Sequence, residues 1–142
     1  GLHRYTFPAS DEAALVFDLE NGGCWDDTKE AFMQAEGDCR IVGYRFSEGW
    51  ASDQRVFFVA EFSKPFDSFE LKGKNNMYGR ASFATADGEE VMLKVAISPV
   101  SIDGAKANLE AELPDWNFKR TIANAEKAWA QELSKMEVTS DD

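Results

Sequence analysis

Hydrophobic and polar residues alternate along the first hundred positions, which is the period of a β-strand whose two faces meet different surroundings. Short polar segments such as Asn21-Gly22-Gly23 and Glu36-Gly37-Asp38 interrupt the alternation, and their residues tolerate the positive φ angles of hairpin turns. A spacing of about ten residues between turns is typical of β-sandwiches. The pattern predicts strands within residues 3–7, 13–19, 29–35, 40–46, 55–62, 66–72, 81–85 and 90–101.

After Ser101 the hydrophobic period changes to about 3.6 residues, the period of an amphipathic helix. Ser101 and Asp103 offer oxygen atoms that can cap the first free amides, which predicts a short helix over 104–113. Pro114 ends that helix because proline lacks an amide hydrogen. A second helix is predicted from Phe118 to about Met136. Its apolar residues form one stripe: Phe118, Ile122, Ala125, Trp129, Leu133 and Met136.

These patterns predict a mainly β fold with C-terminal helices, in which a partial antiparallel β-sandwich precedes a short helix and a long amphipathic helix. We expect residues 1–101 to form the sandwich segment and 102–136 to form connecting helices packing on the sandwich. Residues 137–142 are expected to be a polar tail or linker. With 142 residues, of which 44% are hydrophobic, the chain can bury a core.

The charge balance narrows the range of partners. The formal net charge of -11 opposes binding to phosphate backbones and anionic lipid, so we expect neither a nucleic acid nor a membrane partner. A neutral ligand rich in hydroxyl groups is not repelled. The chain also enters a strand at Leu2 without a polar leader, from which we expect a fragment of a longer protein.

Nucleophilic and metal chemistry have little support in this sequence. A hydrolytic Ser or Cys needs a histidine base, and the only histidine, His3, lies in a predicted strand, where we expect a structural role. Cys24 and Cys39 are too few for a four-ligand zinc site. We expect them to be free or buried thiols, and a disulfide between them is the alternative.

Glycoside hydrolysis requires a pair of carboxylates, one to protonate the leaving oxygen and one to activate water or attack the sugar. Glu48, Asp53 and Glu61 lie in or beside the most aromatic part of the chain. Acids at strand ends and in loops are usually solvated, and nothing distinguishes an acid from a base among these three. We therefore assign no catalytic residue to this chain.

Aromatic residues in polar loops are a stronger signal, because sugars stack their C–H faces on Trp while amides and charged groups bind the hydroxyls. Trp50 lies in the polar loop 47–54, so Trp50, Asp53 and Gln54 are the candidate ligand-binding residues. Trp50 could instead fold back over the end of the sandwich. For Trp25, beside two aspartates, packing is the preferred interpretation.

Three stretches of the chain resemble glycoside hydrolase family 92, the calcium-dependent α-mannosidases. They are Gly1-Leu2-His3-Arg4-Tyr5-Thr6-Phe7-Pro8; Gly43-Tyr44-Arg45 with Gly49-Trp50-Ala51, Asp53-Gln54 and Val56 to Phe66; and Leu93 to Ser98 with Trp116, Phe118 and Ala128-Trp129. The resemblance implies an exo-α-mannosidase, of the inverting and α-1,2 type, that is secreted or periplasmic. Its N-terminal sandwich is joined through helices to a barrel that carries the catalytic acid and base.

On this resemblance, the chain is the later part of the sandwich plus the connecting helices, and it scaffolds and lines the sugar cleft without catalytic residues. The implied partners are mannose-containing glycans, the remaining strands and the barrel, with self-association of the isolated fragment. Calcium is implied for the whole enzyme, whereas no cofactor or metal ligand is assigned within this chain. The alternative function is a stand-alone carbohydrate-binding β-sandwich module. A weaker alternative is a protein-interaction module that uses the helical stripe.

Overall fold

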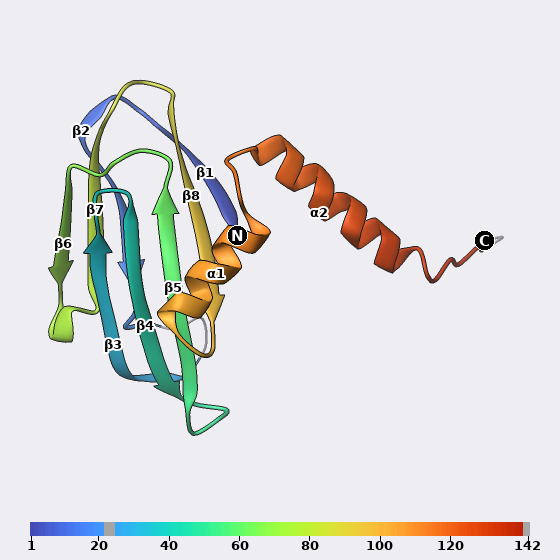
Figure 1. Cartoon of the computed structure of the whole chain (residues 1–142), viewed down its shortest axis with the longest axis horizontal. Helices are drawn as coiled ribbons and strands as arrows, with labels where there is room; N and C mark the ends of the chain where they lie inside the picture. Colours follow the sequence, from blue (N-terminus) through green and yellow to red (C-terminus); the bar gives the residue numbers. More distant parts are fainter. Residues whose placement is uncertain (22–24, 141–142) are drawn as a thin grey trace.

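The chain folds into two antiparallel β-sheets packed face to face, followed by two helices (Figure 1). This computed structural model describes residues 1–21 and 25–140. The five-stranded sheet has the order β1-β8-β5-β4-β3, and the three-stranded sheet has the order β2-β7-β6. The strands are β1 Leu2–Phe7, β2 Ser10–Asp18, β3 Asp27–Glu36, β4 Arg40–Glu48, β5 Gln54–Phe62, β6 Ser68–Lys72, β7 Tyr78–Thr85 and β8 Glu89–Ser98. The predicted fold class is confirmed.

The main core lies between the two sheets and follows from the alternation along each strand. On β4, Ile41 points into this core while the next residue, Val42, faces outward. Gly43 also points inward, where a Cβ atom would lie 2.2 Å from the carbonyl oxygen of Phe32 and 2.8 Å from the ring of Phe58. Glycine is therefore required at this position, because the Phe58 ring packs directly against the backbone of β4 there.

Helix α1, Ile102–Glu112, covers part of the outer face of the five-stranded sheet (Figure 1). The Ser101 hydroxyl accepts a hydrogen bond from the Gly104 amide at 2.9 Å and caps the helix. Ala105 and Leu109 are buried in a second, smaller core formed with two valines of the outer face, Val42 and Val59. The helix begins two residues earlier than the sequence pattern predicts.

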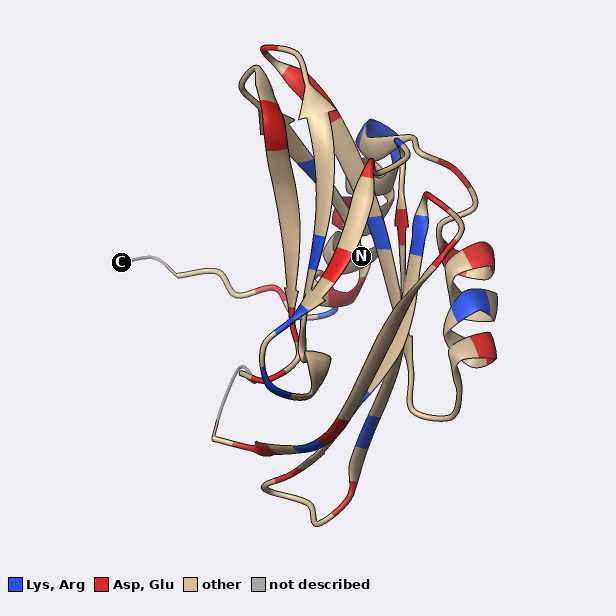
Figure 2. Cartoon of the chain, turned by 90° about the vertical axis from the view of Figure 1, so that its left-hand side faces the viewer, with Lys and Arg blue, Asp and Glu red and all other residues tan. Residues whose placement is uncertain are grey.

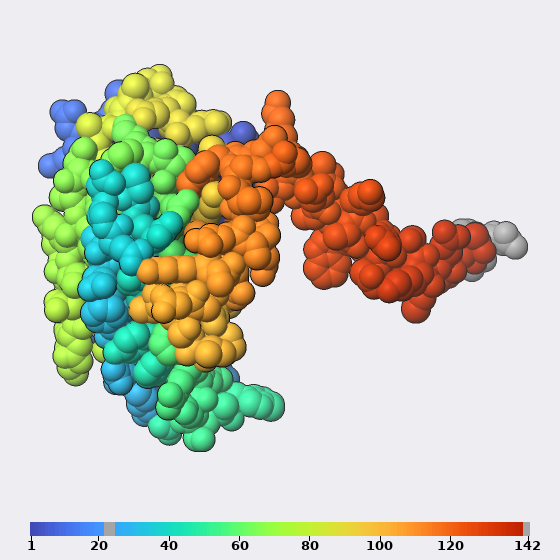
Figure 3. Space-filling view, in the orientation of Figure 1, coloured from blue at the N-terminus to red at the C-terminus, as the bar shows by residue number. Residues whose placement is uncertain are grey.

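Helix α2, Phe118–Leu133, begins beside the sandwich and then extends away from it (Figures 1 and 3). Its apolar stripe is exposed, with Trp129 and Leu133 each 68% accessible. Both helices were expected to pack on the sandwich, and the structure differs for α2. The physical reason is that the linker after Pro114 carries α2 away from the sheet, so the described strands leave its stripe exposed.

Two cation–π contacts hold the linker and the first turn of α2 on the sheet. The Lys94 Nζ atom lies 4.2 Å from the centre of the Trp116 ring, and the Arg4 guanidinium lies 4.5 Å from that of Phe118. Lys94 is buried and also lies 3.8 Å from a carboxylate oxygen of Glu61. A cation–π contact is more favourable in free energy when the cation is buried than when it is exposed to water. The contact of the buried Lys94 is therefore the stronger of the two.

Acidic and basic residues are interspersed over strands, loops and helix, as Figure 2 shows, which is the pattern of a solvated surface. Within the described residues no helix is long and apolar enough to cross a membrane. Cys39 is a free, partly buried thiol, and its pKa is raised mainly because burial disfavours the thiolate. The predicted turn at Gly22-Gly23 and Cys24 lie outside the described residues.

Candidate functional site

The loop that carries Trp50 joins β4 to β5 and projects from one end of the sandwich. A hydrogen bond from the Gly49 amide to the Ala51 carbonyl, 2.9 Å long, tightens the loop. The Trp50 side chain is 90% exposed, so it does not fold back over the end of the sandwich. Such an indole offers an apolar face to a ligand.

Asp53 and Gln54, the other two predicted site residues, lie at the base of this loop. The Asp53 carboxylate accepts hydrogen bonds from Nε of Arg55 at 3.0 and 3.1 Å, and this contact is the first cause that raises the pKa of the Arg55 guanidinium. The Ser47 hydroxyl donates to Oε1 of Gln54 at 3.2 Å. Both side chains therefore make their contacts at the base of the loop that carries Trp50.

Trp25 lies next to the Trp50 loop and is 69% exposed. A Cβ atom on Gly49 would lie 2.7 Å from Cβ of Asp26 and 3.7 Å from the Trp25 ring, so the two segments are in contact. The sequence interpretation, which assigned Trp25 to packing, missed this residue. The two aspartates after this indole, already noted in the sequence, are the signal that favours its exposure.

An ion pair fixes the Trp25 segment to the sheet. Nη1 of Arg45, on β4, lies 2.5 Å from the Asp26 carboxylate, and Nε of Arg45 donates to the Leu19 carbonyl at 3.0 Å. Both side chains are mostly buried, with 17% and 9% exposed. In the described part of the chain, Nη2 of Arg45 is buried without a hydrogen-bond partner. The pair holds Trp25 close to the loop of Trp50.

A polar hollow of about 590 Å³ opens beside Trp25. Its walls come from the end of the β2–β3 connection, the start of β3 and the short 3₁₀ helix η1, Lys74–Asn76. Trp25 supplies an apolar wall, while Asn21, Lys29 and Asn75 supply amide and ammonium groups. A Trp beside amides and charged groups is the combination that recognises a hydroxyl-rich ligand.

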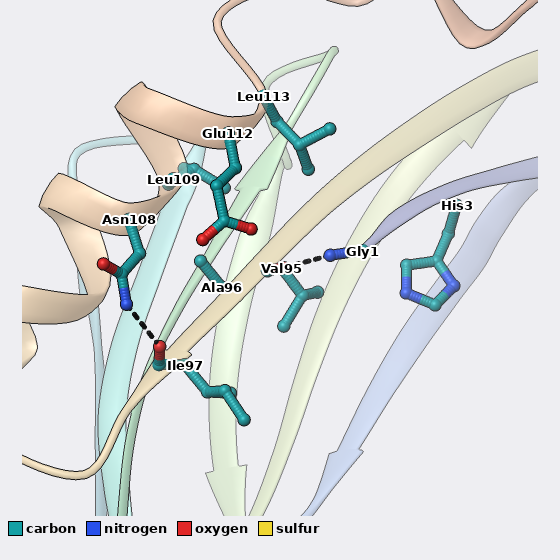
Figure 4. Close-up of a pocket in the computed structure, with 9 residues that line it drawn as sticks. All are labelled: Gly1, His3, Val95, Ala96, Ile97, Asn108, Leu109, Glu112 and Leu113. Carbon is teal, nitrogen blue, oxygen red and sulfur yellow. Dashed lines mark hydrogen bonds between the residues drawn. The ribbon is translucent and has the colours of Figure 1, made fainter. Parts of the chain in front are cut away.

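A second hollow, of about 340 Å³, lies between α1, β8 and the start of β1 (Figure 4). Two of its polar groups are paired with the backbone: Nδ2 of Asn108 donates to the Ile97 carbonyl at 2.9 Å, and the Gly1 amino group donates to the Val95 carbonyl at 2.6 Å. His3, at the rim, stacks on Tyr5 with ring centres 6.0 Å apart. Because these polar groups are already paired with the backbone, they connect α1 and β1 to β8 and are not free to bind a ligand.

The sequence matches the glycosyl hydrolase family 92 N-terminal domain over residues 1–98 and the glycosyl hydrolase family 92 catalytic domain over residues 104–142. The chain belongs to glycosyl hydrolase family 92. This confirms the resemblance found in the sequence. The border between the two matched domains falls between β8 and α1, so the sandwich lies in the N-terminal domain match while most of α1, all of α2 and the tail lie in the catalytic domain match.

Solved structures of family 92 share this fold. The family GH92 alpha-mannosidase BT3965 from Bacteroides thetaiotaomicron is similar with 31% identity and a TM-score of 0.90, and its complex with mannoimidazole gives the same values. The gh92 family glycosyl hydrolase ccman5 has 22% identity and a TM-score of 0.82, which shows the fold alone. The alignments cover 99% of this chain but only 21% and 20% of those proteins. No curated protein sequence matches the chain.

The three candidate carboxylates of the sequence analysis, Glu48, Asp53 and Glu61, each form an ion pair. Glu61 lies 2.6 Å from Arg40, and Glu48 lies 3.3 Å from Lys29. Across residues 1–21 and 25–140, no three His, Cys, Asp or Glu side chains gather closely enough to hold a metal. The described residues therefore do not fit the calcium that the family resemblance implies.

Proposed function

We propose that this chain is a segment of a family 92 α-mannosidase, in which the sandwich is a scaffold and its Trp25–Trp50 end forms one wall of the sugar cleft. The observation that carries the proposal is the ordered match to both family 92 domains. The solved structure that matches 99% of this chain with 31% identity is that of an α-mannosidase. The hydrolytic acid and base belong to the part of the catalytic domain beyond this segment.

The geometry of the Trp25–Trp50 end supports a mannose-containing glycan as the ligand. Two exposed indoles offer faces for the C–H groups of a sugar ring, and the polar hollow beside Trp25 offers partners for the hydroxyl groups. Within the same proposal we place an α-1,2-linked terminal mannose as substrate, calcium held by residues beyond this segment, and a secreted or periplasmic location. The resemblance to family 92 supports these three points.

Hydrolysis of an aryl α-mannoside and of α-mannobiose in the presence of calcium tests the proposal. The 142-residue chain is compared with the longest chain that its gene encodes. We expect turnover by the longer chain alone, since the candidate carboxylates of this segment, Glu48, Asp53 and Glu61, are held in ion pairs. Turnover by the 142-residue chain, abolished by a substitution of one of its own acids, contradicts the assignment of catalysis to the later part of the protein.

The exposed indoles also favour a second function, a carbohydrate-binding module that binds a glycan without cleaving it. Titration of mannobiose against tryptophan fluorescence measures this binding in the 142-residue chain. A saturable change that Trp50→Ala or Trp25→Ala abolishes supports the module. Trp129→Ala is the matched control, because Trp129 is 68% exposed on α2, away from this end. Absence of a saturable change supports the scaffold.

A further inference from the structure

The outer face of the five-stranded sheet is covered by α1 over only part of its area. Ala105 and Leu109 cover the row of side chains that contains Val42 and Val59. Two residues further along the same strands and on β3, the outward side chains are aromatic. We call this set the aromatic patch, and it consists of Phe32 on β3, Tyr44 and Phe46 on β4, and Phe57 on β5.

The rings of the aromatic patch form one continuous cluster. Tyr44 lies at its centre, with ring centres 4.5 Å from Phe46, 5.5 Å from Phe32 and 5.8 Å from Phe57. Charged groups surround it: the Tyr44 hydroxyl donates to Glu30 at 2.6 Å, and the Arg55 guanidinium lies 5.2 Å from the centre of the Phe46 ring. An apolar centre with a polar rim is the composition of a protein–protein interface.

A sugar is a poor fit for this cluster. Stacking on a sugar requires a free ring face, whereas the Tyr44 and Phe46 rings stack on each other with an interplanar angle of 19°. The Arg55 guanidinium lies over the Phe46 ring as well. Phe32 is 37% exposed and the other three are partly exposed, so the patch offers an apolar surface for side chains of another protein segment.

We propose that the aromatic patch continues the interface between the N-terminal and catalytic domains, and that catalytic-domain segments following residue 142 cover it. This inference rests on the proposed function, in which the chain is part of a longer family 92 hydrolase. Most of α1 lies in the catalytic-domain match and already packs on β4 and β5, the strands that carry three of the four rings. The interface already described and the patch are therefore contiguous.

The first turn of α1 reaches the border of the patch. Phe57 is paired with Ser98 of β8, and a Cβ atom on Gly104 would lie 2.7 Å from the Ser98 hydroxyl. The chain spans 21% of the length of the similar α-mannosidase, so most of that protein is available to extend the contact. The catalytic-domain match begins in α1, on the same sheet face as the aromatic patch. Later segments of that domain can therefore cover the patch by extending the contact that α1 already makes.

Hydroxyl-radical footprinting of the 142-residue chain and of the longest natural chain tests the proposal directly. We expect oxidation of Phe32 and Tyr44 to fall several-fold in the longer chain. Leu71, on β6 of the other sheet, is the matched control because it is 38% exposed, and its oxidation should not change. Equal oxidation of Phe32 in both chains, or an equal loss at Leu71, overturns the proposal.

Thermal unfolding of two variants gives a second test that does not depend on labelling. Phe32→Asp should lower the melting temperature of the longer chain by more than that of the 142-residue chain, because it also disrupts the domain contact. Leu71→Asp should affect both chains equally. Equal effects of Phe32→Asp in the two chains count against the interface. So does a Phe32 that is protected only in the 142-residue chain at high concentration, which indicates a second copy as the partner.

The mannoside assay separates the two proposals. Protection of Phe32 in a longer chain that does not hydrolyse α-mannosides overturns the proposed activity and supports the interface. Hydrolysis by a longer chain in which Phe32 stays fully reactive overturns the interface and supports the activity.

Discussion

At the scale of single residues, the arrangement of the Trp25–Trp50 end depends on one ion pair with little access to solvent. Asp26 and Arg45 are 9% and 17% exposed and lie 2.5 Å apart. A pair of this kind contributes little when intact, since desolvation offsets attraction, but loss of one partner leaves a charge without compensation. Trp25, the neighbour of Asp26, therefore depends on Arg45 for its position.

Asp26→Asn should lower the free energy of unfolding by about 3 kcal/mol, because the Arg45 guanidinium then stays buried without its counter-charge. Urea denaturation of the 142-residue chain measures the change. Asp53→Asn is the control, since the Asp53–Arg55 pair has 60% and 56% exposed side chains and should change stability by less than about 1 kcal/mol. Equal effects of the two substitutions would falsify the distinction between the pairs.

At the scale of secondary-structure elements, the two helices differ in what holds them. Leu109 of α1 is 4% exposed in the second core, whereas Leu133 of α2 is 68% exposed. An ion pair also ties α1 to the sheet, because Nζ of Lys106 lies 2.5 Å from Glu36, the last residue of β3. Only α1 is thus an integral part of the described fold.

Leu109→Ala should destabilise the chain by about 3 kcal/mol, through lost burial and the cavity that remains. Leu133→Ala, the same chemical change on an exposed position, should cost less than about 0.5 kcal/mol. Both values come from urea denaturation followed by circular dichroism. A large cost at Leu133 in the isolated chain would show that α2 is packed in solution.

Acid should weaken the attachment of α1. The hydrogen bond from Lys106 is the first cause that holds the pKa of Glu36 below its ordinary value of 4.5. A carboxylate with a depressed pKa adds stability above its unfolded pKa, and this contribution is lost as the pH falls through the lower folded value. Lys106→Met should therefore flatten the acid limb of the stability curve. Lys119→Met, on exposed α2, should leave it unchanged, and identical acid limbs for all three proteins would refute the mechanism.

The elements were predictable because their signals are local. Alternation, the turn residues and the Ser101 cap each act within a few positions, and the observed strands and helices match the predicted ranges apart from their ends. The direction of α2 was not predictable. Its apolar stripe indicates that the helix packs on some other surface, but the sequence does not indicate which surface that is. The contact of the Trp25 segment with the Trp50 loop depends on the pairing of Asp26 with Arg45, 19 residues away in sequence, which no local pattern indicates.

At the scale of the whole molecule, the chain carries apolar surface that its own fold does not cover. The stripe on α2 and the aromatic patch both belong to this surface, and β3 in addition is an edge strand of its sheet. Exposed apolar surface and unpaired strand edges favour association in water. The predicted self-association of the isolated chain follows from these features and is open to measurement.

Sedimentation velocity should show concentration-dependent association of the 142-residue chain. Replacing Trp129 and Leu133 with Glu should shift the chain toward monomer, because the stripe then carries charge. Gln131→Glu adds a charge on the opposite face of α2 and should have little effect. A wild-type chain that stays monomeric over the whole concentration range rules out association through the stripe.

Both cation–π contacts lie at the base of α2, where Lys94 meets Trp116 and Arg4 meets Phe118. The 16-residue helix is about 24 Å long, so a rotation of about 5° at its base displaces its far end by about 2 Å. A misplacement of about 1 Å in a catalytic group can lower a rate about a hundredfold. A substitution at Lys94 therefore changes the angle of α2 at its base, and the resulting displacement is largest at the far end of the helix.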